Sequence, residues 1–421
     1  MSAAGGRISP FGVPRRTRHR PRKEVIAVLK TGKIFLKDGK EKAILNRHPW
    51  VYSGAVARIE GDPSPGDIVD IYSKRGIFLA RGYFNPHSQI TVRVLTHSSG
   101  EEIDHSFFRR RIQEACGIRA GLLPDQTTAC RLVNGEGDFL PGLIVDRYAE
   151  HLVVQINTLG MERWRETIPS VLVDLLSPRT IYERSDSPLR QQEGLKSARG
   201  CLHGPGIPGL VQIQESNARF WVDLKGGQKT GFYLDQRENR MMVGQLAAGR
   251  DVLDCFSYTG AFSVHAARGG ANSLVLVDVS QGALDLAEKN LSLNGLSVSR
   301  ELRCEDVFEF LRRDKRAYDL IILDPPPFVR GKGTIASASR GYKDINLAAL
   351  RRLRTHGLLM SFSCSHHITP DLLQKIIFAA ALDSKRRVQI VGKTGHPTDH
   401  PISVYHPEGE YLKGLLCQVL D

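Results

Sequence analysis

The second half of the 421-residue chain alternates short apolar runs with helix-like stretches, and this alternation limits the possible folds more than any other feature. The runs VLDC, LVLVD, LIILD and LLMSFS alternate with stretches such as AFSVHAARGG and PDLLQKIIFAAALD. Strands that alternate with helices form a parallel sheet with helices on both faces. We therefore predict an α/β domain over residues 216–421. Because such sheets bind ligands at the carboxyl ends of their strands, the residues that end each run are the candidate site residues.

Acidic residues stand where the predicted strands end. The first strand ends at Asp254, before the turn 255–260, and the second ends at Asp278. An acid about 20 residues after the first loop is placed to hydrogen-bond a ribose hydroxyl. The turn 255–260, which reads CFSYTG, lacks the GxGxxG pattern that shapes a pyrophosphate site, so adenosine without a diphosphate fits better, as in S-adenosylmethionine. Asp306 follows a third run and is placed to accept from the adenine amino group, although aspartate also commonly caps helices.

The fourth predicted strand leads into the sequence DPPPF, which begins at Asp324. Its prolines have no backbone donor and stiffen the chain, and Phe328 supplies an aromatic ring. A rigid wall beside a ring suits a flat ligand such as a flipped nucleobase. A stiff loop that merely ends the strand explains the same residues equally well.

Cys364 follows the fifth predicted strand, in the sequence SFSCSHH. A free cysteine is most often a small buried hydrophobic residue. On the predicted topology, however, its strand neighbours the fourth, so that Cys364 and Asp324 face the same pocket. A thiolate that adds to C6 of cytosine turns C5 into an enamine-like nucleophile able to attack a sulfonium methyl group. A protonated Asp324 near N3 would neutralise charge as the thiolate adds. The pattern favours a nucleophile.

The first half of the chain has a different pattern. Residues 24–100 contain short strand-like runs at close spacing, which predict a small β-barrel. Residues 101–215 mix helical and strand-like stretches and end in a glycine-rich linker, which predicts an α+β domain. Arg47, His48 and Trp50 combine cations with an aromatic ring, a mixture that suits a nucleic-acid surface. A tryptophan buried in the barrel core is at least as good an explanation of Trp50 alone.

Charge and cysteine content narrow the class of protein. The net charge of +13 favours a polyanionic partner such as RNA. Residues 1–23 hold seven basic residues and no acid, and we predict a disordered basic arm there; an organelle transit peptide or a mis-assigned start codon are alternatives. The seven scattered cysteines form no CxxC pair, so we expect neither disulfides nor a bound metal. No apolar run approaches the roughly 20 residues of a membrane span, so we expect a cytoplasmic protein without membrane contact.

Seven motifs, in order, resemble those of the bacterial ribosomal RNA large-subunit methyltransferase I family. They are TGFYLDQRENR, LDCFSYTGAFSV, VDVSQGALDLAEKN, DPPPF, RGYKDINLAAL, FSCS and DHPISVYHPEGEYLKG. The likeness extends through RHPWVYSGAVARIEGDPSPGD and covers residues 24–421. The resemblance implies an N-terminal PUA domain, a central α+β domain and a class I, Rossmann-like methyltransferase domain. It also implies 5-methylation of one cytosine in 23S rRNA with S-adenosylmethionine, and a homodimer.

The resemblance assigns roles to individual residues. It makes Cys364 the nucleophile and places four residues of the fourth motif at the base, namely Asp324, Pro325, Pro326 and Phe328. The cofactor site would be lined by Phe256, Ser257, Tyr258, Gly260, Asp278, Ser280 and Asp306. Tyr233 and Gln236 lie in the segment that resembles the family's cofactor-contacting lead-in. The family usually has a residue other than proline at the position of Pro327.

Two other functions remain compatible with the sequence. A guanine N-methyltransferase could use a DPPxF-type loop but would not need a cysteine at position 364. A non-catalytic RNA-binding assembly factor could use the same fold as a clamp, but it would have no use for acids at successive strand ends.

Overall fold

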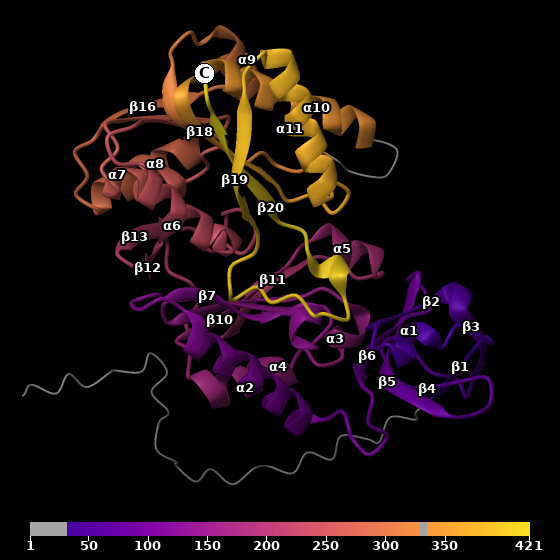
Figure 1. Ribbon diagram of the computed structural model, residues 1–421. Helices are drawn as coiled ribbons and strands as arrows, with labels where there is room; N and C mark the ends of the chain where they lie inside the picture. The colour runs from indigo at the N-terminus through magenta and orange to yellow at the C-terminus, as the bar shows by residue number, and fades with distance from the viewer. Residues whose placement is uncertain (1–31, 329–334) are drawn as a thin grey trace, which may run out of the picture. The chain divides into compact units, whose positions relative to one another are not determined.

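The computed structural model describes residues 32–328 and 335–421 (Figure 1). The predicted basic arm, residues 1–23, lies outside the described residues. The chain forms two compact units. Among the described residues, the first unit contains the chain up to Gly209 together with Leu224–Gly231 and Thr398–Gly409, and the second contains Leu210–Asp223, the chain from Phe232 to Pro397, and Glu410–Asp421.

This division differs from a single cut between residues 215 and 216, because two later segments return to the first unit. Arg184 Nη1 donates to the carbonyl oxygens of Leu224 and Gly227, at 3.3 and 2.6 Å. The buried Arg119 donates to Asp399 O at 3.0 Å, and Asn134 Nδ2 donates to Pro401 O at 3.0 Å. Hydrogen bonds from side chains distant in sequence therefore hold both segments in the first unit. Such long-range contacts are not predicted by a local sequence pattern.

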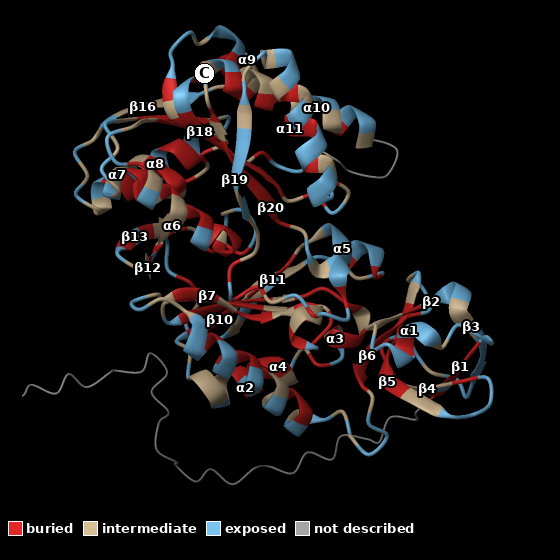
Figure 2. Ribbon diagram, in the orientation of Figure 1, coloured by how far each residue is buried: buried red, intermediate tan, exposed pale blue. Residues whose placement is uncertain are grey.

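The first unit begins with a six-stranded sheet in the order β2-β6-β5-β4-β1-β3. Its elements are β1 (Gly32–Leu36), α1 (Lys42–Leu45), β2 (Trp50–Tyr52), β3 (Val56–Glu60), β4 (Ile68–Tyr72), β5 (Phe78–Phe84) and β6 (Ile90–Thr96). All pairings are antiparallel except that of β1 with β4. Alternate side chains such as Ile34, Leu36, Val69 and Ile71 are fully buried in one core (Figure 2). The short strands predicted between residues 32 and 100 are confirmed, whereas the predicted strand at residues 25–29 lies outside the described residues.

A five-stranded sheet in the order β11-β10-β9-β8-β7 completes the first unit. The strands are β7 (Ala129–Asn134), β8 (Leu143–Tyr148), β9 (His151–Ile156), β10 (Thr180–Ser185) and β11 (Ala198–His203). The helices are α2 (His105–Leu122), α3 (Leu159–Glu162), α4 (Thr167–Leu176) and α5 (Pro188–Gln192). Helices α2 and α4 pack side by side and, with the sheet, bury a core that includes Phe107, Phe108 and Trp164 (Figure 1). The α+β character is as predicted.

The second unit contains a seven-stranded sheet in the order β16-β15-β14-β17-β18-β20-β19. The strands are β14 (Asp251–Cys255), β15 (Ser273–Asp278), β16 (Ser299–Cys304), β17 (Tyr318–Leu323), β18 (Leu353–Ser363), β19 (Val388–Thr394) and β20 (Lys413–Val419). Strands β14 to β18 are parallel, and β20 is antiparallel to both neighbours. The order reverses direction between β14 and β17, and ligands bind beyond the carboxyl ends of strands at such a point.

Helices of the second unit alternate with these strands, as the sequence predicts. They are α6 (Arg237–Leu246), α7 (Ala261–Arg268), α8 (Gln281–Leu293), α9 (Val307–Arg313), α10 (Ile335–Arg352) and α11 (Pro370–Ser384). Helices α10 and α11 pack against each other (Figure 1). A hairpin of β12 (Val211–Glu215) and β13 (Ala218–Val222) precedes them. Within the described residues, no helix combines the length and the apolarity needed to cross a bilayer.

Candidate active site

The loop between β14 and α7 follows a strained left-handed path. Phe256 and Tyr258 have φ angles of 61° and 47°, a region that side chains with a Cβ rarely adopt. Two backbone hydrogen bonds hold the loop there: Ser257 N donates to Val277 O at 3.1 Å, and Tyr258 N donates to Asp278 Oδ2 at 2.8 Å. Non-glycine residues in this conformation persist where the surroundings fix them, typically at ligand-binding sites.

The loop ends at Gly260, where both the backbone conformation and the packing require a glycine. Its φ is 71°, and a Cβ at this position would lie 2.8 Å from Ala287 Cβ and 3.1 Å from Leu276 Cδ2. The start of α7 therefore lies closely against α8 and β15, which brings the loop to the end of β15.

Asp278 joins the end of β15 to the loop. Its Oδ2 accepts from Tyr258 N, and its Oδ1 accepts from Ser280 N at 2.9 Å. Ser280 itself caps α8, because its Oγ accepts from Ala283 N at 3.3 Å. A carboxylate oxygen can accept more than one hydrogen bond, so Asp278 keeps acceptor capacity for a ligand.

Asp254 is buried in β14 beneath the loop. Its Oδ2 accepts from Ser263 Oγ at 2.7 Å. Burial raises the pKa of Asp254 to about 7. The hydrogen bond from Ser263 lowers this pKa, whereas the negative charges of Asp324 and Asp278 raise it further. In the described part of the chain, Asp254 Oδ1, Ser257 Oγ and Thr259 Oγ1 are buried without a hydrogen-bond partner. Such a group of polar atoms is unusual unless a ligand completes it.

Tyr233 and Gln236 lie at the short 3₁₀ helix η3 (Leu234–Gln236) that leads into α6. The ring of Tyr233 packs edge-to-face on that of Tyr258, with 5.5 Å between centroids, so the lead-in contacts the loop. Gln236 is buried, and its Oε1 accepts from Asn239 Nδ2 at 2.6 Å.

Asp306 is the N-cap of α9. Its Oδ1 accepts from Phe308 N at 2.8 Å and from Glu309 N at 3.1 Å. The capping explanation offered by the sequence is therefore confirmed, and contact with adenine stays a prediction.

Asp324 and Cys364 directly follow two adjacent parallel strands, β17 and β18, whose register pairs Leu323 with Ser361. Both residues are half-buried. Burial raises the pKa of Tyr342 to about 12, with increases from negative charge on Cys364 and Asp324. Burial also raises the pKa of Tyr233, and the same two residues add to that increase. Asp324 and Cys364 thus both contribute to the raised pKa of Tyr233 and of Tyr342, and a shared pocket for the two side chains stays a prediction.

Phe328 packs in an aromatic cluster. Its ring centroid lies 4.7 Å from that of Tyr342, 5.7 Å from Phe308 and 6.5 Å from Phe256. Pro325 is buried, whereas Pro326 is exposed. The ring of Phe328 therefore anchors the loop after β17, and stacking on a substrate base stays a prediction.

Family models and known proteins identify the family of the chain. A PUA-like domain model matches residues 34–97, and an S-adenosylmethionine-dependent methyltransferase model matches residues 189–401. The chain is 45% identical over 393 residues to ribosomal RNA large subunit methyltransferase I of Tolumonas auensis, covering 92% of this chain and 99% of that protein. It is also 45% identical over 395 residues to the protein of that name from Yersinia pestis, with 93% and 100% covered. The chain belongs to the ribosomal RNA large subunit methyltransferase I family.

Solved structures support the cofactor of this methyltransferase. A Streptococcus mutans structure named for a SAM-dependent methyltransferase matches with a TM-score of 0.78 and 25% identity, covering 92% of this chain and 100% of that chain. A methyltransferase structure complexed with SAH matches with a TM-score of 0.79, 25% identity and the same coverage. The predicted fold class, the family resemblance and the S-adenosylmethionine cofactor are confirmed. Contact of this ligand with Asp254, Ser257 and Thr259 stays a prediction.

We expect Asp278→Ala to weaken S-adenosylmethionine binding to the methyltransferase by about tenfold to a hundredfold, since a charge-assisted hydrogen bond is worth roughly 1.5–3 kcal/mol. The substitution also frees Tyr258 N, so the loop loses a support. Calorimetric titration measures the change. Asp285→Ala, which removes an exposed carboxylate from α8, is the matched control. Equal affinities for the two variants would remove Asp278 from the cofactor site.

The basic and aromatic residues near the N-terminus lie in the first unit. Trp50 is outside the core of its sheet: it is half-buried, its Nε1 donates to Glu136 Oε1 at 2.9 Å, and its ring lies 4.4 Å from that of His406. His48 Nε2 is 3.5 Å from Glu408 Oε2, and Arg47 lies 5.9 Å from the ring of Tyr405. The barrel-core explanation of Trp50 is therefore wrong, and its role in RNA binding stays a prediction.

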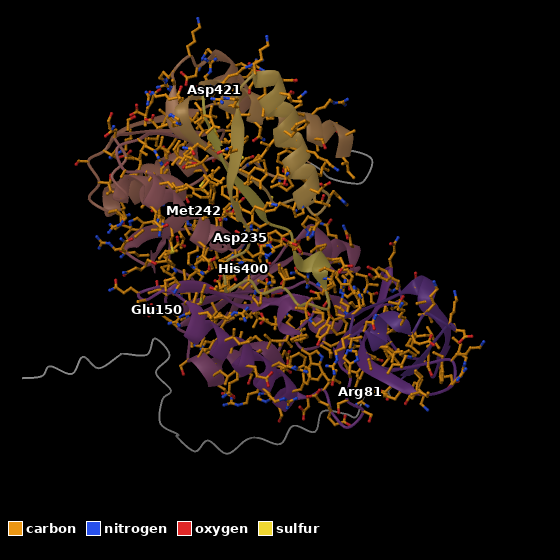
Figure 3. The ribbon with its side chains drawn as sticks, in the orientation of Figure 1. Arg81, Glu150, Asp235, Met242, His400 and Asp421 are labelled. Atoms are coloured by element: carbon orange, nitrogen blue, oxygen red, sulfur yellow. The ribbon has the colours of Figure 1, made fainter. Side chains whose placement is uncertain are left out.

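Sequence reasoning missed two residues near Cys364. Tyr342 is fully buried, and its Oη accepts from Ser363 Oγ at 3.1 Å. Lys413 Nζ donates to Ser365 O at 2.6 Å. Nearby, Tyr411 Oη donates to Asp235 Oδ2 at 2.8 Å; Figure 3 labels Asp235 within the second unit. For Lys413, the signal available in the sequence was its position as the one charged residue of the apolar strand KGLLCQV.

Proposed function

We propose that this methyltransferase transfers a methyl group to C5 of one cytosine in 23S rRNA through a covalent bond between Cys364 and C6 of the base. The observation that carries the proposal is the position of Asp324 and Cys364, which directly follow the adjacent parallel strands β17 and β18. The relatives named as methyltransferases of large-subunit ribosomal RNA support the choice of RNA.

Cys364 and Asp324 divide the chemistry between them. The Cys364 thiolate forms the S–C6 bond, the π pair of the C5–C6 double bond moves to C4–C5, and the π pair of the C4–N3 double bond moves onto N3. A protonated Asp324 hydrogen-bonds N3 and stabilises the negative charge that develops there. When bound, S-adenosylmethionine would supply an electrophilic methyl group for C5, with the S–CH3 bonding pair staying on its sulfur as S-adenosylhomocysteine leaves. A base then takes the C5 proton, the C5–H bonding pair restores the C5–C6 double bond, and the S–C6 pair leaves with Cys364 as a thiolate.

The first unit supplies the RNA surface in this proposal. The PUA-like domain model covers the strands that carry Trp50, and Arg47 and His48 stand beside it. The net charge of +13 favours the phosphate backbone. A homodimer and a cytoplasmic location stay predictions.

RNA with 5-fluorocytosine at the target position tests the proposal. Fluorine at C5 does not leave as a proton does, so the methylated base should stay bound to Cys364. We expect a protein–RNA complex that survives denaturing electrophoresis, requires S-adenosylmethionine and is absent with Cys364→Ala. Methylated RNA without any trapped complex would contradict the covalent route, and methyl groups found on guanine would favour the N-methyltransferase alternative.

A further inference from the structure

Lys413 is an almost fully buried lysine at the start of β20, with only 5% of its surface exposed. Lysine is among the residues least often buried unless a partner compensates its charge, because removing an ammonium group from water is costly. Its neighbours should therefore include a compensating group.

Lys413 lies beside the chain segment that contains Cys364. The antiparallel register pairs Lys413 with Ser363 on β18, and Nζ donates to Ser365 O at 2.6 Å. Lys413 thus contacts the residues on both sides of Cys364 in the chain. Within residues 32–328 and 335–421, Lys413 makes no other hydrogen bond by its side chain and no ion pair with a carboxylate, although an ammonium group has three donors.

The electrostatics of Lys413 agree with this placement. Burial lowers its pKa, and the two groups that raise it back are Cys364, which acts more strongly, and Glu410. Glu410 is exposed, so its charge is screened by water. The negative charge that best compensates the buried ammonium group is a thiolate at Cys364.

We propose that Lys413 is the counter-ion of the Cys364 thiolate and acts as a positioning residue through it. The inference rests on the proposed covalent route. When the thiol ionises, its proton passes to water and a buried ion pair replaces a buried, uncompensated ammonium group. Cations beside a thiol favour its ionised form. Other titratable groups surround this position: Asp235, Asp324, Tyr233, Tyr258, Tyr342, Tyr411, His366 and His367.

Lys413 would act twice in one turnover. It stabilises the thiolate that attacks C6, and it stabilises the same thiolate when the S–C6 bond breaks, because a thiol that ionises more readily is a better leaving group. Asp324 bears negative charge when ionised and so opposes the thiolate, which makes a nearby cation more important.

The pH dependence of Cys364 alkylation tests the proposal. Intact protein is treated with iodoacetamide over a range of pH, and mass spectrometry follows the peptide that contains Cys364. A thiol beside a cation ionises with a midpoint up to about 7.5, whereas a free thiol does so near about 8.5. We expect Lys413→Met to move the midpoint up by about one pH unit or more, and Lys413→Arg to keep it. Lys393→Met, which removes an exposed charge from β19, is the matched control.

Methyl transfer provides the second readout. At pH 7 the rate with Lys413→Met should fall about tenfold for each unit of midpoint shift, and most of that loss should disappear near pH 9, where the thiol ionises without help. A merely structural role of Lys413 would give a loss that does not depend on pH.

Separate outcomes distinguish this inference from the proposed function. An unchanged alkylation midpoint in Lys413→Met, with Cys364→Ala still inactive, would overturn the counter-ion role and leave the covalent route standing. Full activity of Cys364→Ala would overturn the covalent route itself. If Lys413→Met does not fold, Lys413→Gln keeps a donor for Ser365 O without the charge and allows the same comparison.

Discussion

Cys364→Ala should reduce methyl transfer on the order of 10⁴-fold or more, as removal of a covalent nucleophile does in other enzymes. Without the S–C6 bond, C5 of cytosine is too weak a nucleophile to take the methyl group. Binding of S-adenosylmethionine should stay within about twofold of the parent protein, because cofactor-loop residues such as Tyr258 and Asp278 follow different strands. Single-turnover methylation with labelled cofactor and calorimetric titration measure the two effects.

Cys417→Ala is the matched control for this substitution. Cys417 lies in β20 of the same sheet, is fully buried in the hydrophobic core, and has its pKa raised by burial to about 12. Cys364 is half-buried and not part of that core. We therefore expect Cys417→Ala to lower stability and keep methyl transfer. Robust methylation by Cys364→Ala would make Cys364 a packing residue and favour methylation of guanine.

The sequence was sufficient to predict the sheet and the residues that follow its strands. Asp278, Asp324 and Cys364 stand at the ends of apolar runs, and parallel strands present their carboxyl ends at one edge. Their positions at the end of β15 and directly after β17 and β18 therefore follow from the alternation of strands and helices alone.

Contacts between residues distant in the chain were not predictable. Lys413 reaches Ser365 only because β20 inserts antiparallel between β18 and β19. Trp50 meets His406 because Thr398–Gly409 returns to the first unit. A local pattern gives the type of an element but not its partner. The sequence fitted two roles for Asp306, namely helix capping and contact with adenine. The structure shows the capping hydrogen bonds at the start of α9.

The largest loss of stability is expected from Glu215→Ala. Glu215 ends β12, fully buried, and its carboxylate oxygens lie 2.8 Å from Arg240 Nε, 2.5 Å from Arg240 Nη2 and 3.0 Å from His265 Nε2. The alanine variant leaves the guanidinium of Arg240, 1% exposed, without its carboxylate. Removing one partner of a buried ion pair costs about 3–5 kcal/mol, a large part of a typical free energy of unfolding of about 5–15 kcal/mol.

The pH dependence of this loss has a definite sign. Burial alone would raise the pKa of Glu215, but the charge and hydrogen bonds of Arg240, with the hydrogen bond of His265, outweigh burial and hold the pKa well below its ordinary value of 4.5. A depressed carboxyl pKa contributes stability above the unfolded value, and this stability is lost as the pH falls. The difference between the parent protein and Glu215→Ala should therefore be full at pH 7 and shrink below about pH 4.5.

Urea unfolding of Glu215→Ala and Glu288→Ala compares the stability lost with a buried Arg–Glu pair and with an exposed one. Glu288 makes an Arg–Glu pair with Arg300 in the same unit, but its side chain is 44% exposed, and such pairs contribute about 0–1 kcal/mol. Arg240 Nη1 also donates to Tyr233 O at 2.8 Å, so loss of Glu215 should loosen the lead-in to the cofactor loop and weaken S-adenosylmethionine binding as well. If the two variants lose equal stability, the buried network contributes no more than a surface pair, and Tyr233 is held instead by its packing on Tyr258.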